Sequence, residues 1–133
     1  MMHRLFVYGT LLAGLCRHSV MQGAPLLGAA HTQGVLYDLG PYPAMVAGDA
    51  RVHGELYEVS DALLAQLDEV EAYDPQRPEA SEYVRQQVTL WLSQGGSQLA
   101  WTYVYNRSVA QAHRIAHGDY RRHLKHTGYT PTW

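Results

Sequence analysis

Residues 53–71 read HGELYEVSDALLAQLDEVE and contain the two clearest structural signals of the chain. In residues 53–59, apolar and polar side chains alternate, which is the pattern of a strand with one buried face. Ser60 or Asp61 then provides a helix cap, and apolar residues recur at helical spacing up to about Glu71. A strand that leads directly into a helix predicts a domain containing both.

The predicted helix carries three acidic residues close together: Asp68, Glu69 and Glu71. Its apolar positions are Leu63, Leu64, Leu67 and Val70. On a helical wheel with the first leucine at 0°, these four define an arc about 120° wide. Glu71 falls at about 80° inside this arc, Asp68 at about 140° on its edge, and Glu69 at about 240° toward solvent. The pattern predicts that only Glu71 of the three faces the core.

A buried carboxyl at this position has the properties of a catalytic acid or base. Burial should raise the pKa of Glu71, and the negative end of the helix macrodipole should raise it further. Such a group suits proton transfer near neutral pH. Two structural alternatives are that Glu71 swings out at a fraying helix end, or that it pairs with an arginine such as Arg85.

Further strands are expected on both sides of this helix. They cover residues 5–8, 34–40, 44–48, 82–92 and 99–106, and residues 94–97 (QGGS) predict a hairpin between the last two. A short helix is expected at 14–21, and at least one more between 109 and 126, interrupted near Gly118. Residues 74–81 are expected to form a loop, either a plain connection or a lid. Without strict alternation of strand and helix, the fold class is α+β, and a closed or half-closed barrel would hide the strand edges.

The length and composition narrow the class of protein. The 133 residues fit a single domain, residues 1–133, and 47% hydrophobic with 17% charged residues is a globular composition. A net charge of -2 argues against a nucleic acid or an anionic membrane as partner. The short basic run at 121–126 is expected to be a solvated helix face, or else to touch an anionic ligand.

Several other classes of site receive little support. Cys16 is the only cysteine, which excludes an intrachain disulfide and a Cys-rich zinc site and favours a reducing compartment. The first 16 residues imitate a signal peptide, but a Gly-Thr pair breaks the apolar run. No apolar run of membrane-spanning length exists, so we predict no membrane partner and a cytoplasmic location.

His113 and His117 have i, i+4 spacing without the glutamate or third ligand of a zinc site, so no metal is expected. Neither Ser19 nor Cys16 has the context of a catalytic nucleophile.

A second local signal is the turn after the first strand. It consists of Tyr8, Gly9, Thr10 and Leu11. Glycine there would let consecutive N–H groups converge on a carboxylate or a developing oxyanion. Turns of this kind are common, so the motif is weak by itself.

Together these segments resemble the γ-glutamylcyclotransferase-like (AIG2-like) family over roughly residues 5–124. The matching strings are FVYGTL at 6–11, GVLYDLGPYPA at 34–44, VHGELYEV at 52–59, LDEVEAY at 67–73, EYVRQQV at 82–88, WTYVY at 101–105 and IAHGDYRRHL at 115–124. The resemblance implies a small mixed β-barrel flanked by helices, with the turn facing an essential glutamate across a cavity.

The resemblance also implies the roles of particular residues. Glu71 matches the catalytic glutamate of the family. The substrate-binding residues it implies are Tyr8, Gly9, Thr10 and Leu11 by their backbone, and Tyr83 and Tyr105 as aromatic walls. The implied reaction is intramolecular aminolysis of a small γ-glutamyl amide or amine, which releases 5-oxoproline and a free amine without metal or cofactor.

One departure from the family pattern and two rival functions remain open. The family commonly has glycine after the glutamate, where this chain has Ala72; a positive φ would be strained there. The first rival is a binding protein that holds a small carboxylated ligand without turnover. The second is an enzyme of the same fold that acts on another amide. The sequence predicts no particular oligomeric state.

Overall fold

The structure of the protein is a computed structural model, which describes residues 1–132. Its strands are β1 (Met2–Val7), β2 (Leu26–Asp38), β3 (Pro43–Ser60), β4 (Tyr83–Leu92), β5 (Ser97–Tyr105) and β6 (His113–Ile115). Its α-helices are α1 (Asp61–Val70) and α2 (Tyr120–Thr127), and short 3₁₀ turns cover His18–Met21 and Pro78–Ala80. Neither helix has the length and hydrophobicity that a membrane crossing requires.

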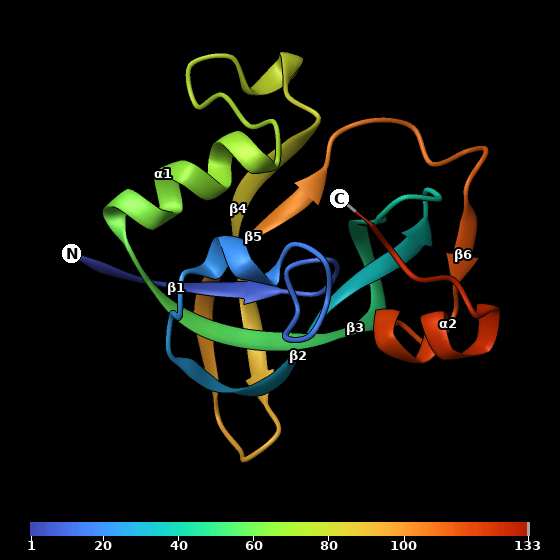
Figure 1. The fold of residues 1–133 in the computed structure, drawn as a ribbon, viewed down its shortest axis with the longest axis horizontal. Coiled ribbons are helices and arrows are strands. Elements are labelled where there is room, and N and C mark those ends of the chain that lie inside the picture. Colours follow the sequence, from blue (N-terminus) through green and yellow to red (C-terminus); the bar gives the residue numbers. More distant parts are fainter. Residues whose placement is uncertain (133) are drawn as a thin grey trace.

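The strands form a ring-like sheet. Their order is β3-β1-β5-β4-β2-β6, and a further pairing of β2 with β3 closes the ring, leaving β6 as an extension on β2. Two seams are short, since β1 and β5 pair in parallel only at Leu5 and Trp101, and β2 meets β4 at three positions. The helices α1 and α2 lie on opposite sides of the sheet (Figure 1). The predicted α+β class and mixed barrel are confirmed, although the ring is less regular than a full barrel.

Two long strands replace several of the shorter ones expected. The predicted strands at 44–48 and 53–59 are parts of β3, and the one at 34–40 is the second half of β2. The first half of β2 went unrecognised because its glycines and small residues give no alternating pattern. Register shifts between Leu26 and Gly28 and between Gln33 and Val35 disturb that pattern further.

The two less distinct helices also differ from the expectation. Only His18–Met21 of the segment 14–21 is helical, as a 3₁₀ turn. Between 109 and 126 the chain forms β6 and then α2, so His113 lies on a strand and the helical spacing of His113 and His117 does not apply. Gly118 lies between the two elements, and only glycine fits there, because a Cβ would lie 1.8 Å from the carbonyl oxygen of Arg51.

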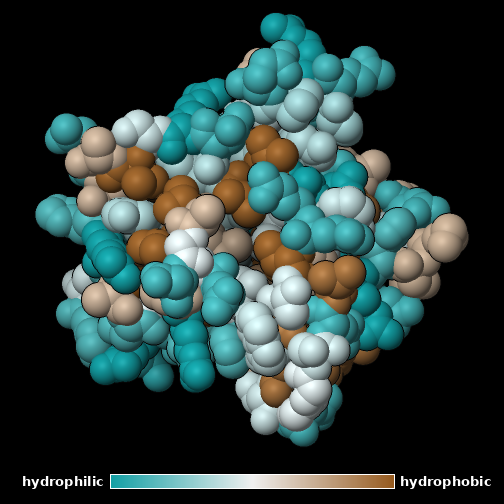
Figure 2. Space-filling model, turned by 180° about the vertical axis from the view of Figure 1, so that it is seen from behind, coloured by the Kyte–Doolittle hydropathy of each residue, from teal (hydrophilic) through white to brown (hydrophobic). Residues whose placement is uncertain are grey.

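The hydrophobic core fills the inside of the ring. Its fully buried side chains include Leu5, Phe6, Leu56, Leu67 and Leu90. Each such side chain contributes about 1.5–3 kcal/mol relative to an exposed position. The rear face is mostly hydrophilic, with hydrophobic side chains showing in patches between hydrophilic ones (Figure 2). This is the usual surface of a small globular protein.

The helix α2 is fastened to the loop that follows β1. The Arg121 guanidinium donates to the backbone oxygen of Ala13 at 2.6 Å and to the Glu55 carboxylate at 3.1 Å. The same carboxylate accepts hydrogen bonds from the N–H of Ala13 and from the Tyr57 hydroxyl. At least this member of the basic run at 121–126 is therefore part of a polar cluster rather than a plain solvated face.

The helix α1 has well-formed caps at both ends. Ser60 caps its first turn by accepting a hydrogen bond from the N–H of Leu63. At the other end, the N–H groups of Ala72 and Tyr73 donate to the carbonyls of Glu69 and Asp68, which is the Schellman arrangement. Ala72 takes the left-handed conformation that this motif requires, with φ at 53°. The positive φ considered from the sequence is present, and the turn forms with alanine in it.

Ala72→Gly should stabilise the protein by about 0.5–1 kcal/mol. Relief of the left-handed strain outweighs the extra unfolded-state entropy of glycine, and the exposed methyl group contributes little packing. Urea unfolding with an unchanged m-value is the measurement. Ala65→Gly, at an exposed position in the middle of α1, is the control and should cost about 1 kcal/mol. A destabilised Ala72→Gly protein would contradict the strain argument.

Candidate active site

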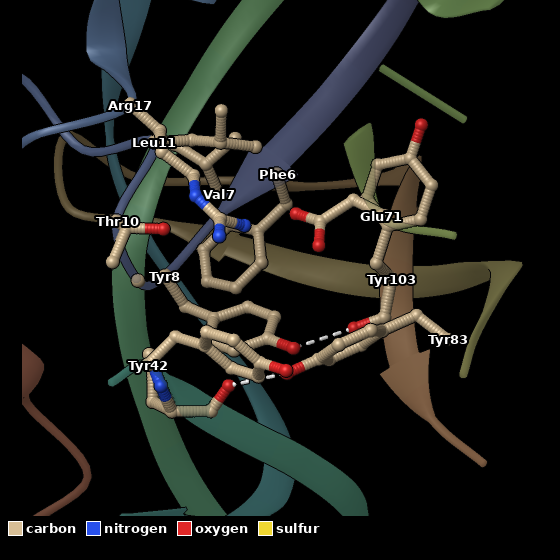
Figure 3. A pocket seen from close by; sticks show the side chains of 12 residues that line it. Phe6, Val7, Tyr8, Thr10, Leu11, Arg17, Tyr42, Glu71, Tyr83 and Tyr103 are labelled. Atoms are coloured by element: carbon tan, nitrogen blue, oxygen red, sulfur yellow. Dashed lines mark hydrogen bonds between the residues drawn. The ribbon is translucent and has the colours of Figure 1, made fainter. Parts of the chain in front are cut away.

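A cavity lies between the end of β1 and the end of α1. It encloses about 370 Å³ of empty space, counted to its open mouth. Its lining residues are Phe6, Val7, Tyr8, Gly9, Thr10, Leu11, Arg17, Tyr42, Pro43, Glu71, Tyr83 and Tyr103 (Figure 3). The cavity thus brings together the turn at residues 8–11, hereafter the 8–11 turn, and Glu71, which are far apart in the sequence.

The 8–11 turn is shaped by close packing. A Cβ on Gly9 would lie 2.6 Å from Cγ of Pro43, so no larger residue fits between the turn and the start of β3. Gly9 does not have a positive φ, so its small size rather than its backbone freedom is what the site uses. Within residues 1–132, the N–H groups of Gly9, Thr10 and Leu11 donate no hydrogen bond to the protein. They remain available to a negatively charged atom in the cavity.

Glu71 occupies the cap position at the end of α1, and its carboxyl group points into the cavity (Figure 3). Burial raises the pKa of this carboxyl to about 7. The positive charge of Arg17 lowers the pKa, and the negative charge of Glu82 raises it. A carboxyl with this pKa exchanges a proton readily at neutral pH.

Asp68 corrects one sequence-based prediction. The helical wheel placed it at the edge of the apolar arc and left Glu71 as the only inward acid, but Asp68 is buried, at 7% exposure, whereas Glu71 is partly buried. Its carboxylate accepts two hydrogen bonds from the Arg85 guanidinium, at 2.8 and 3.2 Å, and one from the Tyr103 hydroxyl at 2.8 Å. These partners compensate the loss of hydration. Arg85 therefore binds Asp68, and the expected alternative of a Glu71–Arg85 pair is wrong.

Comparison with known proteins identifies the family. The family model for γ-glutamyl cyclotransferase, AIG2-like, matches residues 5–122. The chain belongs to this family. The match confirms the family predicted from the sequence strings, and with it an enzyme of the γ-glutamylcyclotransferase-like type.

Individual relatives agree with this assignment. The γ-glutamylcyclotransferase family protein YtfP of Escherichia coli K12 is 39% identical over 118 residues, which is 88% of this chain and 95% of the relative. The γ-L-glutamyl-butirosin B γ-glutamyl cyclotransferase of Niallia circulans is 42% identical over 108 residues, or 80% of this chain and 69% of the relative. The crystal structure of an AIG2-like protein from Mus musculus superposes with a TM-score of 0.75 at 25% identity, covering 90% and 88% of the two chains.

Tyrosines form much of the remaining wall of the cavity. The Tyr8 hydroxyl donates to the backbone oxygen of Tyr103 at 2.6 Å, and the Tyr83 hydroxyl donates to that of Pro43 at 2.8 Å. Burial raises the pKa of both hydroxyls well above the ordinary value, so both stay protonated at neutral pH. They orient the cavity wall and do not serve as bases.

Tyr105 lies behind the wall rather than in it. Tyr83 lines the cavity as predicted, whereas Tyr105 is absent from the lining and packs its ring against Tyr83, with 5.2 Å between centroids. Tyr103, two residues earlier on the same face of β5, takes the lining position instead. The resemblance named Tyr105 for the wall, but Tyr103 of the same string is the tyrosine that reaches the cavity.

Two lining residues of this family member, Arg17 and Tyr42, were not predicted to belong to the site, although Tyr42 lies in the matching string at 34–44. Arg17 follows the 8–11 turn by six residues, and its guanidinium lies 5.3 Å from the centroid of the Tyr42 ring. The Tyr42 hydroxyl donates to the Glu82 carboxylate at 2.6 Å, which raises the pKa of Tyr42 to about 12. The segment 41–43 had indicated only a turn. Among residues 1–132, no cluster of three or more His, Cys, Asp or Glu residues is arranged to hold a metal ion.

Glu71→Gln should make the folded protein more stable at alkaline pH. The pKa of Glu71 is raised from about 4.5 to about 7 on folding, so the unfolded chain loses this proton first as the pH rises, and wild-type stability falls between those values. Glutamine has no ionised form, so its burial carries no such cost at high pH. We expect no difference at pH 4 and a gain of about 1–3 kcal/mol for the variant at pH 8.

Urea unfolding of both proteins at the two pH values measures this difference. Glu69→Gln removes an exposed acid from the same helix and serves as the matched control. A Glu71→Gln protein that gains nothing at pH 8 would show that the carboxyl is well solvated.

Proposed function

We propose that this protein cleaves small γ-glutamyl amides or γ-glutamylamines by intramolecular aminolysis, with Glu71 as acid and base. The observation that carries the proposal is a carboxyl group with a pKa of about 7 in the same cavity as the 8–11 turn. The names of the E. coli and N. circulans relatives support the same reaction class. The substrate is a small molecule, and the reaction uses no metal or cofactor.

The first half of the reaction forms the new ring. The Glu71 carboxylate takes a proton from the α-ammonium group of the substrate, and the free amine attacks its own γ-carbonyl carbon. A C–N bond forms, and the carbonyl oxygen becomes negatively charged. The N–H groups of Gly9, Thr10 and Leu11 are the donors to this oxyanion or, alternatively, to the α-carboxylate.

The second half releases the products. Glu71, now protonated, gives its proton to the departing nitrogen as the original C–N bond breaks and the γ-carbonyl re-forms. The ring nitrogen still carries one proton more than the lactam does, and the Glu71 carboxylate takes this proton and releases it to solvent. The products are 5-oxoproline and a free amine, and Glu71 is again a carboxylate. A pKa near 7 suits both steps, since the same group must accept and donate a proton.

An intramolecular reaction suits a small cavity. The nucleophile and electrophile belong to one molecule, and effective molarities of well-oriented intramolecular reactions reach about 10⁵–10⁸ M. General acid–base catalysis adds about 10²–10⁴-fold. The tyrosine wall and the 8–11 turn would hold the substrate folded, with Tyr105 supporting Tyr83 from behind. The single cysteine, Cys16, fits a protein that acts in the reducing cytoplasm.

A panel of γ-glutamyl compounds tests the activity directly. It includes a γ-glutamyl-alkylamide, γ-glutamyl-ε-lysine and a γ-glutamyl dipeptide, each incubated with wild type and Glu71→Gln while 5-oxoproline is followed by mass spectrometry. We expect turnover by wild type and a loss of at least about 10³-fold in the variant, because proton acceptance and donation are both removed. Glu69→Gln should retain wild-type activity.

Other outcomes of this panel identify the rival functions. Saturable binding of a γ-glutamyl compound without any product would favour a binding protein. Release of an amine together with glutamate would show hydrolysis and contradict the cyclisation. The absence of both binding and turnover for every panel compound would favour an enzyme that acts on another amide.

The pH dependence of kcat/KM should report the ionisation of Glu71. Activity of the free enzyme requires the carboxylate, so kcat/KM should rise with pH through an acidic limb at about pH 7. The limb in kcat should lie lower, because the substrate ammonium next to Glu71 favours the charged carboxylate. An acidic limb near pH 4.5 in kcat/KM would contradict a desolvated Glu71.

A further inference from the structure

Arg17 brings a positive charge into the cavity that holds the Glu71 carboxyl. Both side chains line the cavity, and they point toward each other across it (Figure 3). Arg17 also acts on Glu71 electrostatically, since burial raises the pKa of the Glu71 carboxyl and the positive charge of Arg17 lowers it. The cavity therefore presents a permanent cation and a titratable acid on facing sides.

The 8–11 turn itself holds Arg17 in place. The N–H of Arg17 donates to the backbone oxygen of Thr10 at 3.0 Å, and the ring Nδ1 of the next residue, His18, hydrogen-bonds the backbone oxygen of Leu11 at 2.8 Å. The guanidinium lies against the Tyr42 ring, a favourable cation–π arrangement. Arg17 and the 8–11 turn thus form one connected unit.

The γ-glutamyl group carries two opposite charges on one carbon, an α-ammonium and an α-carboxylate. The proposed mechanism directs the ammonium to Glu71. A guanidinium on the facing side matches the carboxylate, because its planar fork donates two parallel hydrogen bonds to such a group. We infer that Arg17 binds the α-carboxylate of the γ-glutamyl group and selects substrates in which this carboxylate is free. The inference rests on the function proposed above.

This assignment gives Arg17 and the 8–11 turn different roles in substrate binding and catalysis. If Arg17 takes the α-carboxylate, the N–H groups of Gly9, Thr10 and Leu11 are left for the oxyanion that forms on the γ-carbonyl. The rival arrangement has the 8–11 turn holding the carboxylate while Arg17 only adjusts the ionisation of Glu71. The two arrangements differ in how a substrate without the carboxylate responds to loss of Arg17.

A matched pair of substrates distinguishes them. γ-Glutamyl-n-butylamide and 4-aminobutanoyl-n-butylamide differ only in the α-carboxylate; the second would cyclise to 2-pyrrolidinone and release the same amine. The rates are measured at pH 8.5, above the acidic limb, so that a change in the ionisation of Glu71 does not affect them. Wild type should prefer the first by at least about 100-fold in kcat/KM.

The variants then separate charge from shape. Arg17→Gln should lower kcat/KM about 100-fold for the glutamyl substrate and less than about threefold for the other. Arg17→Lys keeps the charge but not the fork and should lose about tenfold. Arg114→Gln removes an exposed arginine outside the cavity and should change neither rate. An equal loss on both substrates in Arg17→Gln would overturn the inference.

Product binding gives a readout that needs no turnover. In an NMR titration, wild type should bind 5-oxoproline at least about tenfold tighter than 2-pyrrolidinone, and Arg17→Gln should bind both equally. This outcome supports the carboxylate site even if every compound of the panel resists turnover, a result that would defeat only the proposed reaction. Equal binding of both compounds by wild type, no binding, or a preference that survives in Arg17→Gln would overturn the inference.

Discussion

The contact between Asp68 and Arg85 determines where α1 lies and, through it, where the acid of the cavity lies. Asp68 is bound by a guanidinium from β4 and a tyrosine hydroxyl from β5, and its backbone oxygen accepts the closing hydrogen bond of the helix cap. One residue thus fixes both the rotation of α1 about its axis and the place where it ends. Glu71 follows three positions later, and its direction is a consequence of these constraints.

This arrangement separates two acids of one helix by their surroundings. The Asp68 carboxylate accepts three hydrogen bonds, two from the Arg85 guanidinium and one from the Tyr103 hydroxyl, and has a structural role. Glu71 has a nearby cation but also a nearby anion in Glu82, and burial dominates. The hydrogen bonds of Asp68 stabilise the position of α1, and this stabilisation offsets the cost of placing the Glu71 carboxyl in the cavity. Because burial destabilises its charged form, Glu71 is suited to proton transfer.

Much of the fold and part of the site followed from the sequence, for identifiable reasons. The strand at 53–59, α1 and the hairpin near Gly95 have strong local patterns, and local patterns predict local structure well. The first half of β2 and the strand β6 depend on partners that are distant in sequence, so no local signal marks them. The helical wheel identified Glu71 but misjudged Asp68, since a wheel shows only the residues of one helix and contains no information on Arg85 of β4. Arg17 and Tyr42 could not be found in this way, because a single residue in a turn becomes a lining residue only when the chain closes around it.

The clamp formed by Arg121, Glu55 and Ala13 links regions that are far apart in the chain. Residues of α2 do not line the cavity, yet Arg121 of α2 hydrogen-bonds the loop that joins the 8–11 turn to Arg17. Since α2 follows every lining residue in the chain, the ribosome makes it after them, and this loop is fastened only once α2 has been made. A nascent chain lacking α2 would already contain every lining residue. It would lack the Arg121 hydrogen bonds that fasten the loop between the 8–11 turn and Arg17.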